Sequence, residues 1–365
     1  MYPALSIAEA LQIADFGLQI EKDKSAISNL TSEILWIGSR GGMEEELVTR
    51  AGLPLKTIHS GGVHGVGWRL PFNALNLVRG FFEALGLVRH FQPNALLVTG
   101  GFVTAPVALA AWINRVPILV YLPDIEPGLA VQFISRLARR LAVTVADSRT
   151  YFDDRKVVVT GYPTRPELIA ASRDEALLHF DLDPTRRTVL VTGGSRGARS
   201  LNQALFAALA ELLKDYQVIH LSGQLDWAEA ERARDALPAD LRARYHAFPF
   251  LHEMGLALAA ADVVVSRAGA SALGEYPLFA LPAILVPYPF AWRYQKVNAD
   301  YLVERGAAIR VNDEDLPARL VHEVRTLLGN PERLVRMRAA ARAAATPDAA
   351  RRIAQELVAL AGAAS

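Results

Sequence analysis

The feature that most constrains this chain is the regular alternation of short apolar runs with helical patterns. In the first half, the runs that predict strands lie at residues 34–38, 55–59, 95–99, 118–121, 142–145 and 157–160. Helical patterns open the chain and separate these runs, among them residues 43–51, 72–91, 106–114 and 129–140. Short buried strands that alternate with helices are typical of a parallel, doubly wound sheet, so the sequence predicts an α/β fold.

The alternation starts again after residues 161–166, a segment whose two prolines suit a stiff linker. Strands are predicted at residues 188–192, 217–222, 245–248, 262–266, 283–286 and 308–310, with helices at 200–214, 225–236, 254–260, 272–279 and 295–305. A break at Thr346-Pro347-Asp348 precedes a last helix. The sequence therefore predicts a first domain at residues 1–160, a second at 161–345, and a C-terminal helix at 346–365 that packs back on the first domain.

Charge balance and residue inventory exclude several classes of protein. The 365 residues include 39 Lys and Arg against 38 Asp and Glu, and a net charge of +1 indicates no nucleic-acid partner. The chain has no cysteine, which excludes disulfides, thiolate zinc sites and cysteine nucleophiles. No clustered carboxylates or histidines indicate a metal site, and no cofactor is expected. No apolar run reaches the ~18–20 residues that span a bilayer and no signal peptide is visible, so we expect a cytoplasmic protein whose membrane contact is peripheral.

The predicted strand at residues 188–192 runs into a glycine loop, Gly193-Gly194-Ser195-Arg196-Gly197, and then into a helix. Glycines allow the backbone to approach an anion, the N–H groups of the helix N-terminus face that anion, and Ser195 adds a hydroxyl donor. A plain tight turn is the alternative, and the short motif does not decide between them. The loop lacks the GxGxxG spacing of dinucleotide sites and the Gly-Lys-Ser/Thr of a P-loop.

Two more loops follow predicted strands in the second domain. The loop at residues 266–275 ends in Glu275, where a carboxylate can accept two ribose hydroxyl hydrogen bonds. A first-turn glutamate favoured by the helix dipole is the structural alternative. Farther on, Gln295 and Asn298 lie near a helix start, where their amides could read sugar hydroxyls or face solvent. Because the carboxyl ends of parallel strands meet at one edge of a sheet, the three loops together indicate a nucleotide-sugar site.

These ordered motifs resemble those of the MurG family, whose members transfer N-acetylglucosamine from its UDP donor to lipid I. GGSRGARSLNQAL at 193–205 resembles the family's signature, and ADVVVSRAGASALGE at 261–275, LPAILVPYPF at 281–290 and QKVNA at 295–299 resemble its donor-binding segments. In the first half, TGGFV at 99–103 and GYPTR at 161–165 also match. The resemblance implies a GT-B fold, in which two Rossmann-like domains face a cleft, the first binding the acceptor and the second the UDP-sugar.

The resemblance also implies which residues bind substrate. Residues of the second domain and the linker would hold the donor diphosphate, uracil, ribose and sugar: Arg165, Gly194, Ser195, Arg196, Gly197, Leu251 through its backbone, Ala270, Ser271, Glu275 and Gln295. Two positions depart from the family's pattern. Asp124 replaces an asparagine in a first-domain substrate loop, and Tyr294 replaces the first of two paired glutamines, which leaves donor and acceptor preference open.

The implied reaction is an inverting glycosyl transfer in which the muramoyl 4-hydroxyl of lipid I attacks the anomeric carbon, UDP leaves and lipid II forms. It needs a base for the hydroxyl and stabilisation of the leaving diphosphate, which the glycine loop and Arg165 can supply without metal. Asp124 and His64 are candidates for the base, and neither is assigned. A surface histidine is the alternative interpretation of His64.

Family members begin with a strand and a Gly-Gly-Thr-Gly-Gly-His loop before the segment that matches Tyr2-Pro3-Ala4-Leu5. The resemblance therefore predicts that the recorded start lies downstream of the natural one, or that the gene is truncated. The strand belongs inside the first sheet, and its loss would leave unpaired backbone edges. The loop offers amides to the acceptor diphosphate.

Because lipid I is a membrane lipid, the resemblance places the first domain at the inner face of the cytoplasmic membrane. Trp68, Phe72 and Leu75 lead into an apolar helix with arginines nearby, and Trp112 matches an exposed position of the family's membrane patch. Apolar anchors beside cations suit anionic lipid. Packing of the same helix on the sheet is the alternative.

The sequence is also compatible with three other functions. One is a glycolipid transferase that uses UDP-galactose and diacylglycerol, and another is a UDP-N-acetylglucosamine 2-epimerase of the same two-domain shape. The third is a non-catalytic relic that binds a UDP-sugar through Ser195 and Glu275 without turnover.

Overall fold

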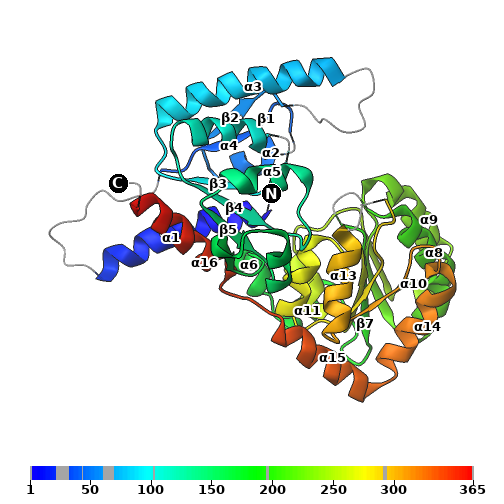
Figure 1. The fold of residues 1–365 in the computed structure, drawn as a ribbon. Helices are drawn as coiled ribbons and strands as arrows, with labels where there is room; N and C mark the ends of the chain where they lie inside the picture. The colour runs from blue at the N-terminus through cyan, green and yellow to red at the C-terminus, as the bar shows by residue number, and fades with distance from the viewer. Residues whose placement is uncertain are drawn as a thin grey trace. The chain divides into compact units, whose positions relative to one another are not determined.

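The computed structural model describes residues 2–21, 33–42, 44–60, 70–101, 103–194, 197–290 and 294–363 (Figure 1). The chain forms two compact units. Unit 1 comprises Met1–Pro163 together with Pro347–Ser365, and unit 2 comprises Thr164–Thr346. Every strand pairing in both units is parallel, with helices between the strands, so the predicted α/β class is confirmed.

The strands of unit 1 form two groups. β1 (Trp36–Ser39) pairs with β2 (Leu55–Ile58), while β3 (Leu96–Val98), β4 (Ile118–Leu122), β5 (Arg140–Val143) and β6 (Val157–Val159) form a four-stranded sheet in that order. Ile37 and Leu96 pack into one apolar cluster and Ile34 and Leu97 into another, so both groups lie in one layer. The single sheet that the sequence predicted is thus divided, because ladder hydrogen bonds need strands about 4.8 Å apart and no described strand joins β1 to β3.

Helices cover both faces of this layer (Figure 1). The predicted helical start is present as α1 (Tyr2–Glu21), which packs against α16 (Ala349–Gly362) and on one face of the sheet. The other face is covered by α3 (Leu70–Phe91), α4 (Thr104–Ile113) and α5 (Leu129–Leu137). α2 (Glu44–Arg50) connects β1 to β2. The last helix of the chain therefore completes the core of unit 1.

Unit 2 is built on one six-stranded parallel sheet in the order β12-β11-β10-β7-β8-β9. The strands are β7 (Thr188–Thr192), β8 (Gln217–Leu221), β9 (Tyr245–Phe248), β10 (Val263–Ser266), β11 (Ala283–Leu285) and β12 (Ala308–Arg310). β7 and β10 are neighbours although two strands separate them in the chain, so the winding direction reverses between them. Sheets of this order bind ligands outside the carboxyl ends of the strands, near that reversal.

The helices of unit 2 lie on both faces of the sheet (Figure 1). α8 (Arg199–Asp215) and α14 (Leu316–Leu328) share a core with the outward side chains of β7 and β10, among them Val189 and Val263. The remaining helices are α6 (Pro166–Ile169), α7 (Arg173–His179), α9 (Trp227–Asp235), α10 (Ala239–Arg242), α11 (Met254–Ala260), α12 (Glu275–Leu278), α13 (Tyr294–Glu304) and α15 (Pro331–Ala343). Strands that are buried throughout, as β7 and β8 are, require helices on both faces.

A buried aspartate joins the amino-terminal side of this sheet to two helices. The Asp262 side chain is 1% exposed and accepts hydrogen bonds from Arg187 at 2.9 Å, Arg338 at 2.8 Å and Arg173 at 3.2 Å, as well as from the Thr188 amide at 2.9 Å. Burial raises the pKa of Asp262, but these hydrogen bonds and charges outweigh it, so the pKa lies below its usual value. The carboxylate therefore stays ionised and ties β10 to β7, α7 and α15.

The predicted helix at residues 272–279 is divided in the structure. A 3-10 turn at Ala270–Leu273 precedes α12, and Gly274 separates the two. Pro277 has no N–H to donate, so it is tolerated only in the first turn of a helix, which it occupies here. The sequence also did not predict α7 or the 3-10 turn at Ala146–Tyr151.

Candidate active site

The glycine loop follows β7 and leads into α8. Gly194 has φ +83° and Gly197 has φ +75°, a region in which a side chain is strained. A Cβ on Gly197 would lie 2.4 Å from the carbonyl oxygen of Ser222, and one on Gly193 would lie 2.3 Å from the amide nitrogen of Ala198. A Cβ on Gly194 would meet nothing within 4 Å. The backbone is therefore tightly packed at Gly193 and Gly197 and open at Gly194.

The backbone N–H groups in the first turn of α8 donate no hydrogen bond to the side chain of the N-cap residue. The N-cap is Ala198, which has no side-chain oxygen, and no side-chain cap hydrogen bond is formed there. Uncapped first-turn amides and the positive end of a helix dipole form an anion site. The backbone N–H groups at the start of α8 thus suit a phosphate group.

Beneath Gly197, buried side chains hold the end of β8. Asn202 Nδ2 donates to the Ser222 carbonyl oxygen at 2.8 Å, and Asn202 Oδ1 lies 3.0 Å from His220 Nε2. His220 Nε2 must donate to this oxygen, so His220 Nδ1 accepts from the Tyr245 hydroxyl at 2.7 Å. Burial lowers the pKa of His220 to about 3, and the ring is neutral. The same Ser222 carbonyl that Gly197 approaches is therefore fixed from the core.

Glu275 begins α12 after the loop that follows β10. It is partly buried, and none of the described residues forms a hydrogen bond with its carboxylate. Burial raises the pKa of Glu275 to about 7, while the positive charge of Arg165 acts in the opposite direction. The structure thus brings these two predicted donor-binding residues close together. A carboxylate with unused acceptor capacity can bind two hydroxyl groups.

The two predicted sugar-reading amides differ in the structure. Gln295, at the start of α13, accepts the Tyr288 N–H through Oε1 at 2.8 Å, which leaves its NH₂ group as a donor. Asn298 is fully buried and donates to the Ala268 carbonyl oxygen at 3.2 Å. The interpretation of Asn298 as a sugar-reading amide is therefore wrong, because its side chain supports the loop after β10 from inside.

The other predicted donor-binding residues of unit 2 also follow strand ends. Leu251 lies just beyond β9, and Ala270 and Ser271 lie in the 3-10 turn beyond β10. Gln295 follows β11, and Gly194 follows β7. Because the four strands are parallel, all of these positions lie at the carboxyl edge of one sheet.

In unit 1, Asp124 lies two residues beyond the end of β4 and is half-buried. The loop that carries it is anchored by Thr144, whose hydroxyl donates to the Pro123 carbonyl oxygen at 2.9 Å and lies 2.9 Å from the hydroxyl of Tyr121. Burial and the neighbouring charge of Asp124 raise the pKa of Tyr121, which stays protonated. Asp124 is thus held at the carboxyl edge of the unit 1 sheet.

Several predicted residues lie outside the part of the chain that the structure describes. These are His64, Trp68, Ser195 and Arg196, and the side chain of Phe72 in α3 is likewise not described. Among the described residues, no three His, Asp or Glu side chains gather as metal ligands would.

An apolar surface lies on α3 and α4. Leu75, Val78 and Phe82 lie on one face of α3 and are 60%, 53% and 64% exposed, and Trp112 near the end of α4 is 53% exposed. On its other face, α3 packs into the unit 1 core through residues such as Ala84. One face of α3 thus packs on the layer while the other is exposed, and its contact with a membrane stays a prediction. No described helix is long and apolar enough to cross a bilayer.

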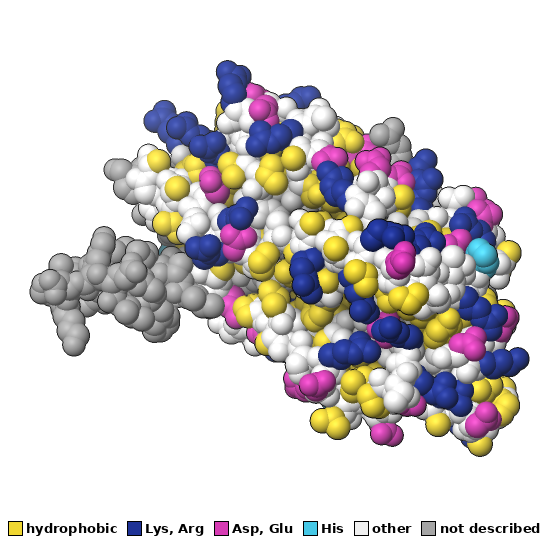
Figure 2. All heavy atoms as spheres, turned by 90° about the horizontal axis from the view of Figure 1, so that it is seen from below, with side chains coloured by type: hydrophobic (Ala, Val, Ile, Leu, Met, Phe, Trp, Pro, Cys, Tyr) yellow, Lys and Arg dark blue, Asp and Glu magenta, His cyan; other side chains and the backbone are white. Residues whose placement is uncertain are grey.

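Charged side chains are mixed over the surface. Figure 2 shows one face on which basic side chains lie among acidic and apolar ones. Many of them are paired, as Arg325 is with Glu211 and Asp215. Such mixing agrees with the near-zero net charge of the chain.

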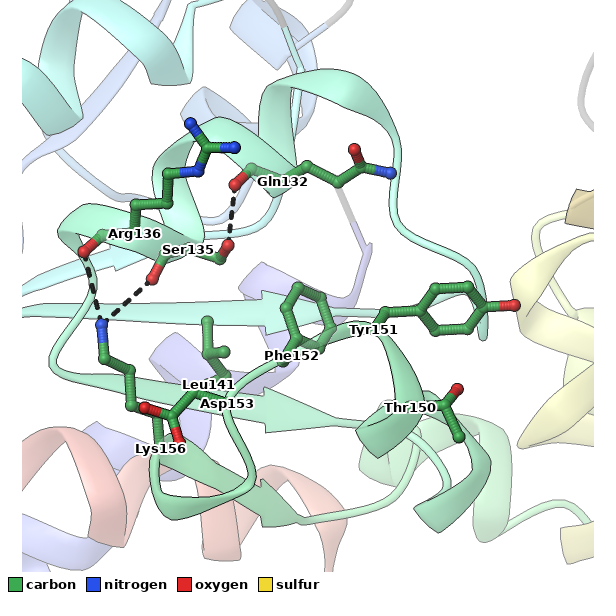
Figure 3. Close-up of a pocket in the computed structure, with 9 residues that line it drawn as sticks. All are labelled: Gln132, Ser135, Arg136, Leu141, Thr150, Tyr151, Phe152, Asp153 and Lys156. Carbon is green, nitrogen blue, oxygen red and sulfur yellow. Dashed lines mark hydrogen bonds between the residues drawn. The ribbon is translucent and has the colours of Figure 1, made fainter.

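A cavity of about 460 Å³ lies in unit 1, and none of its lining residues is a predicted site residue (Figure 3). Lys156 Nζ donates to the carbonyl oxygens of Ser135 and Arg136 at 3.5 and 3.3 Å, while the Arg136 guanidinium and the Gln132 amide point elsewhere. The polar groups that line the cavity do not converge on one point, whereas those of a binding site do. The cavity therefore adds nothing to the site in unit 2.

Sequence reasoning missed the buried support beneath the glycine loop. His220 and Tyr245 lie within predicted strands, and Asp226 accepts from Asn202 Nδ2 at 2.8 Å. A buried histidine in a strand carries no sequence signal that separates it from a surface one. Only Asn202, inside the signature segment, could have been singled out.

Comparison with known proteins agrees with this geometry. The chain matches the glycosyltransferase family 28 N-terminal domain at residues 1–143 and the C-terminal domain at residues 188–353. It is 39% identical over 403 residues to the UDP-N-acetylglucosamine–N-acetylmuramyl-(pentapeptide) pyrophosphoryl-undecaprenol N-acetylglucosamine transferase of Roseiflexus sp. (strain RS-1), covering 97% of this chain and 91% of that protein. The enzyme of that name from Moorella thermoacetica is 37% identical over 367 residues, covering 98% and 95%.

Solved structures share the fold. MurG of Acinetobacter baumannii superposes with a TM-score of 0.73 at 24% identity, covering 98% of this chain and 95% of that one. A UDP-GlcNAc 2-epimerase from Neisseria meningitidis superposes with a TM-score of 0.64 at 14% identity, covering 97% of each chain. These likenesses show the two-domain GT-B architecture. The sequence relationship is closer, and the chain belongs to the MurG family of N-acetylglucosamine transferases within glycosyltransferase family 28.

Proposed function

We propose that this protein transfers N-acetylglucosamine from UDP-N-acetylglucosamine to lipid I, forming lipid II for peptidoglycan synthesis. Relatives named for this activity share 32% to 39% sequence identity with this protein over 97% of its length. The observation that carries the proposal is the uncapped start of α8 at the same sheet edge as the carboxylate of Glu275, which lies near the positive charge of Arg165. Amides that can bind a phosphate and a carboxylate that can accept hydrogen bonds from ribose hydroxyls lie at the same edge of the sheet. This combination suits a nucleoside diphosphate sugar.

We assign donor binding to unit 2. The amides after Gly194 and the side chain of Ser195 hold the diphosphate, and Arg165 adds positive charge. Glu275 accepts the ribose hydroxyls, the backbone of Leu251 binds uracil, and the Gln295 amide reads the sugar. The positive φ values of the loop and the fixed Oε1 of Gln295 support these assignments. Ala270 and Ser271 complete the loop beneath the sugar.

The reaction inverts the anomeric carbon. The muramoyl 4-hydroxyl forms the new C–O bond as the bond to UDP breaks, and its proton passes to a base. The leaving diphosphate gains negative charge, which the amides at the start of α8 and Arg165 stabilise. Asp124 is the candidate base within the described residues, since it lies half-buried at the carboxyl edge of unit 1. An Asp124→Asn variant that keeps wild-type turnover would remove it from this role.

We assign the acceptor and the membrane to unit 1. The exposed face of α3, with Leu75 and Phe82, and the nearby Trp112 would enter the lipid interface, while the exposed Arg79 on α3 meets anionic headgroups. Trp68 and Phe72 belong to the same proposed contact. The protein would thus act as a peripheral enzyme at the inner face of the cytoplasmic membrane.

One assay separates the possible activities. The chain is mixed with radiolabelled UDP-N-acetylglucosamine and a lipid I analogue, and the label is followed into lipid and into free sugar. Transfer to lipid I is the expected result. Transfer from UDP-galactose to diacylglycerol instead would identify a glycolipid transferase, and release of an epimerised free sugar would identify an epimerase. Tight UDP binding with no product of any kind would identify a non-catalytic relic.

A further inference from the structure

A compact hydrogen-bonded cluster joins the loops of unit 2. Arg267 Nη2 donates to Ser200 Oγ at 2.7 Å, and Arg267 Nη1 lies 2.5 Å from Asp313 Oδ1. Ser200 Oγ in turn donates to Asp313 Oδ1 at 2.9 Å, so the three side chains close a ring. Arg267 Nη1 also donates to the carbonyl oxygen of Val286 at 3.1 Å.

The members of this cluster come from four neighbouring strand ends. Ser200 is the second residue of α8, directly after the glycine loop that follows β7. Arg267 directly follows β10, Val286 directly follows β11, and Asp313 lies three residues beyond β12. The cluster therefore crosses the carboxyl edge of four adjacent strands, beneath the loops assigned to the donor.

The chemistry of Arg267 differs from that of an anion ligand. Its side chain is 9% exposed and that of its partner Asp313 is 17% exposed, so the two charges neutralise each other inside the protein. A planar guanidinium offers several donors in a fixed geometry, which allows one side chain to hold three acceptors from different segments. Its remaining contact is with Tyr288, whose ring centroid lies 5.3 Å from the guanidinium carbon.

Through Tyr288 the cluster reaches the sugar end of the site. The Tyr288 N–H donates to Gln295 Oε1, the contact that orients the Gln295 amide. At the other end, Ser200 lies in the first turn of α8, whose amides would hold the diphosphate. One arginine thus connects the segment that would hold the phosphates with the segment that would hold the sugar.

We propose that Arg267 is a positioning residue that, with Ser200 and Asp313, fixes the phosphate-binding first turn of α8 relative to the sugar-binding loop after β11. The proposal rests on the donor site proposed above. Loss of Arg267 should therefore weaken the binding of some ligands and not of others. Uridine needs only the loops around Leu251 and Glu275, so its binding does not depend on the α8 amides. UDP and UDP-N-acetylglucosamine need these amides in the correct position relative to the other loops.

The test removes the cluster without leaving a buried charge. Removing Arg267 alone strands the Asp313 carboxylate and can unfold the protein, whereas replacing both partners by apolar residues of similar size is tolerated in many proteins. The variant is therefore Arg267→Met with Asp313→Leu. We expect its urea midpoint to stay near that of the wild type, its Kd for UDP to rise about tenfold or more, and its Kd for uridine to change less than about twofold. The KM for UDP-N-acetylglucosamine should rise with that Kd while the KM for lipid I stays unchanged.

A matched control uses the other end of the same helix. Arg325 Nη2 contacts Asp215 Oδ2 at 2.9 Å, where α8 ends, so Arg325→Met with Asp215→Leu makes the same two substitutions at an exposed ion pair away from the strand ends. This control should bind UDP as the wild type does. A graded series supports the comparison, in which Ser200→Ala weakens UDP binding by a smaller factor and Ser200→Thr, which keeps the hydroxyl, restores it.

Each result has one meaning. Equal losses for UDP and uridine, or wild-type UDP binding in the folded double variant, would overturn the positioning role. If the double variant does not fold, Ser200→Ala against Ser200→Thr decides the question, since a loss of UDP affinity that threonine does not rescue contradicts the proposal. If the wild type binds UDP but transfers no sugar, the proposed activity fails while the effect of Arg267 on the UDP site is still measured. A wild type that does not bind UDP overturns both.

Discussion

The side-chain amide of Asn202 and the ring of His220 meet 3.0 Å apart inside unit 2, and this contact fixes the tautomer of the histidine. Asn202 Nδ2 is already used as a donor to the Ser222 carbonyl oxygen, so His220 Nε2 must carry the proton. The buried pair holds the strand end on which Gly197 packs. A residue with no access to substrate thereby contributes to the shape of the phosphate loop.

His220 makes the stability of unit 2 depend on pH. Its folded-state pKa of about 3 lies below the unfolded value of 6.5, so between these limits the unfolded chain binds a proton that the folded protein does not. Above pH 6.5 the protonation of His220 therefore takes nothing from the free energy of unfolding. Between pH 6.5 and about 3, that free energy falls by about 1.4 kcal/mol for each unit by which the pH falls. Urea unfolding at pH 7 and pH 5 should show this slope, and His220→Gln should flatten it. A His220→Gln profile that parallels the wild type would contradict the assignment.

Gly197 should tolerate no side chain. Alanine there combines a φ of +75° with a Cβ 2.4 Å from the Ser222 carbonyl oxygen, which is backbone and cannot move aside. We expect Gly197→Ala to cost more than about 2 kcal/mol and to abolish UDP binding. Gly306 is the control, since its φ is +74° but its Cβ would meet nothing closer than 3.9 Å. Gly306→Ala should cost about 1 kcal/mol and leave UDP binding intact, as calorimetry would show.

Glu275 should make donor binding depend on pH near neutrality. Burial raises its pKa to about 7, and only the ionised carboxylate accepts two ribose hydroxyl hydrogen bonds. Bound ribose favours the ionised form, so binding releases a proton below pH 7, and affinity for UDP should fall by up to about tenfold per unit as the pH drops. Calorimetry in buffers of different ionisation enthalpy measures that proton. The Glu275→Gln variant should bind weakly and without this dependence, and a wild type whose affinity is flat between pH 6 and 8 would refute the prediction.

The exposed face of α3 should bind lipid. Leu75→Ser with Phe82→Ser replaces two apolar side chains that are 60% and 64% exposed, so the fold should be retained. Sedimentation with anionic vesicles should show binding weakened by about tenfold or more, from the loss of burial of both side chains in the interface. Leu178 and Leu225 in unit 2 are 84% and 87% exposed and serve as the control pair. Equal vesicle binding by both double variants and the wild type would exclude this surface as the membrane contact.

Much of the fold followed from sequence pattern. Runs such as residues 188–192 and 217–222 have apolar, β-branched centres and lie between helical patterns, and in the structure their strands are buried throughout, as in a sheet covered on both faces. Because Gly194, Glu275 and Gln295 follow predicted parallel strands, the sequence also placed them at one edge of the sheet. The pattern could not reveal that β1 and β3 lack a shared ladder, because pairing depends on which strands become neighbours and not on how apolar each one is.

The sequence by itself determined the α/β class, the restart of the strand–helix alternation between the two units, and the family, because periodicity and ordered motifs are local properties of the chain. Only the tertiary structure decided the roles of individual polar residues. Asn298 and Gln295 are similar amides three positions apart on one helix, yet one is buried under the loop after β10 and the other remains available as a donor. Arg267 and Asp313 became a pair only when four strand ends met. Such roles depend on burial and on partners distant in sequence, which the folded packing alone establishes.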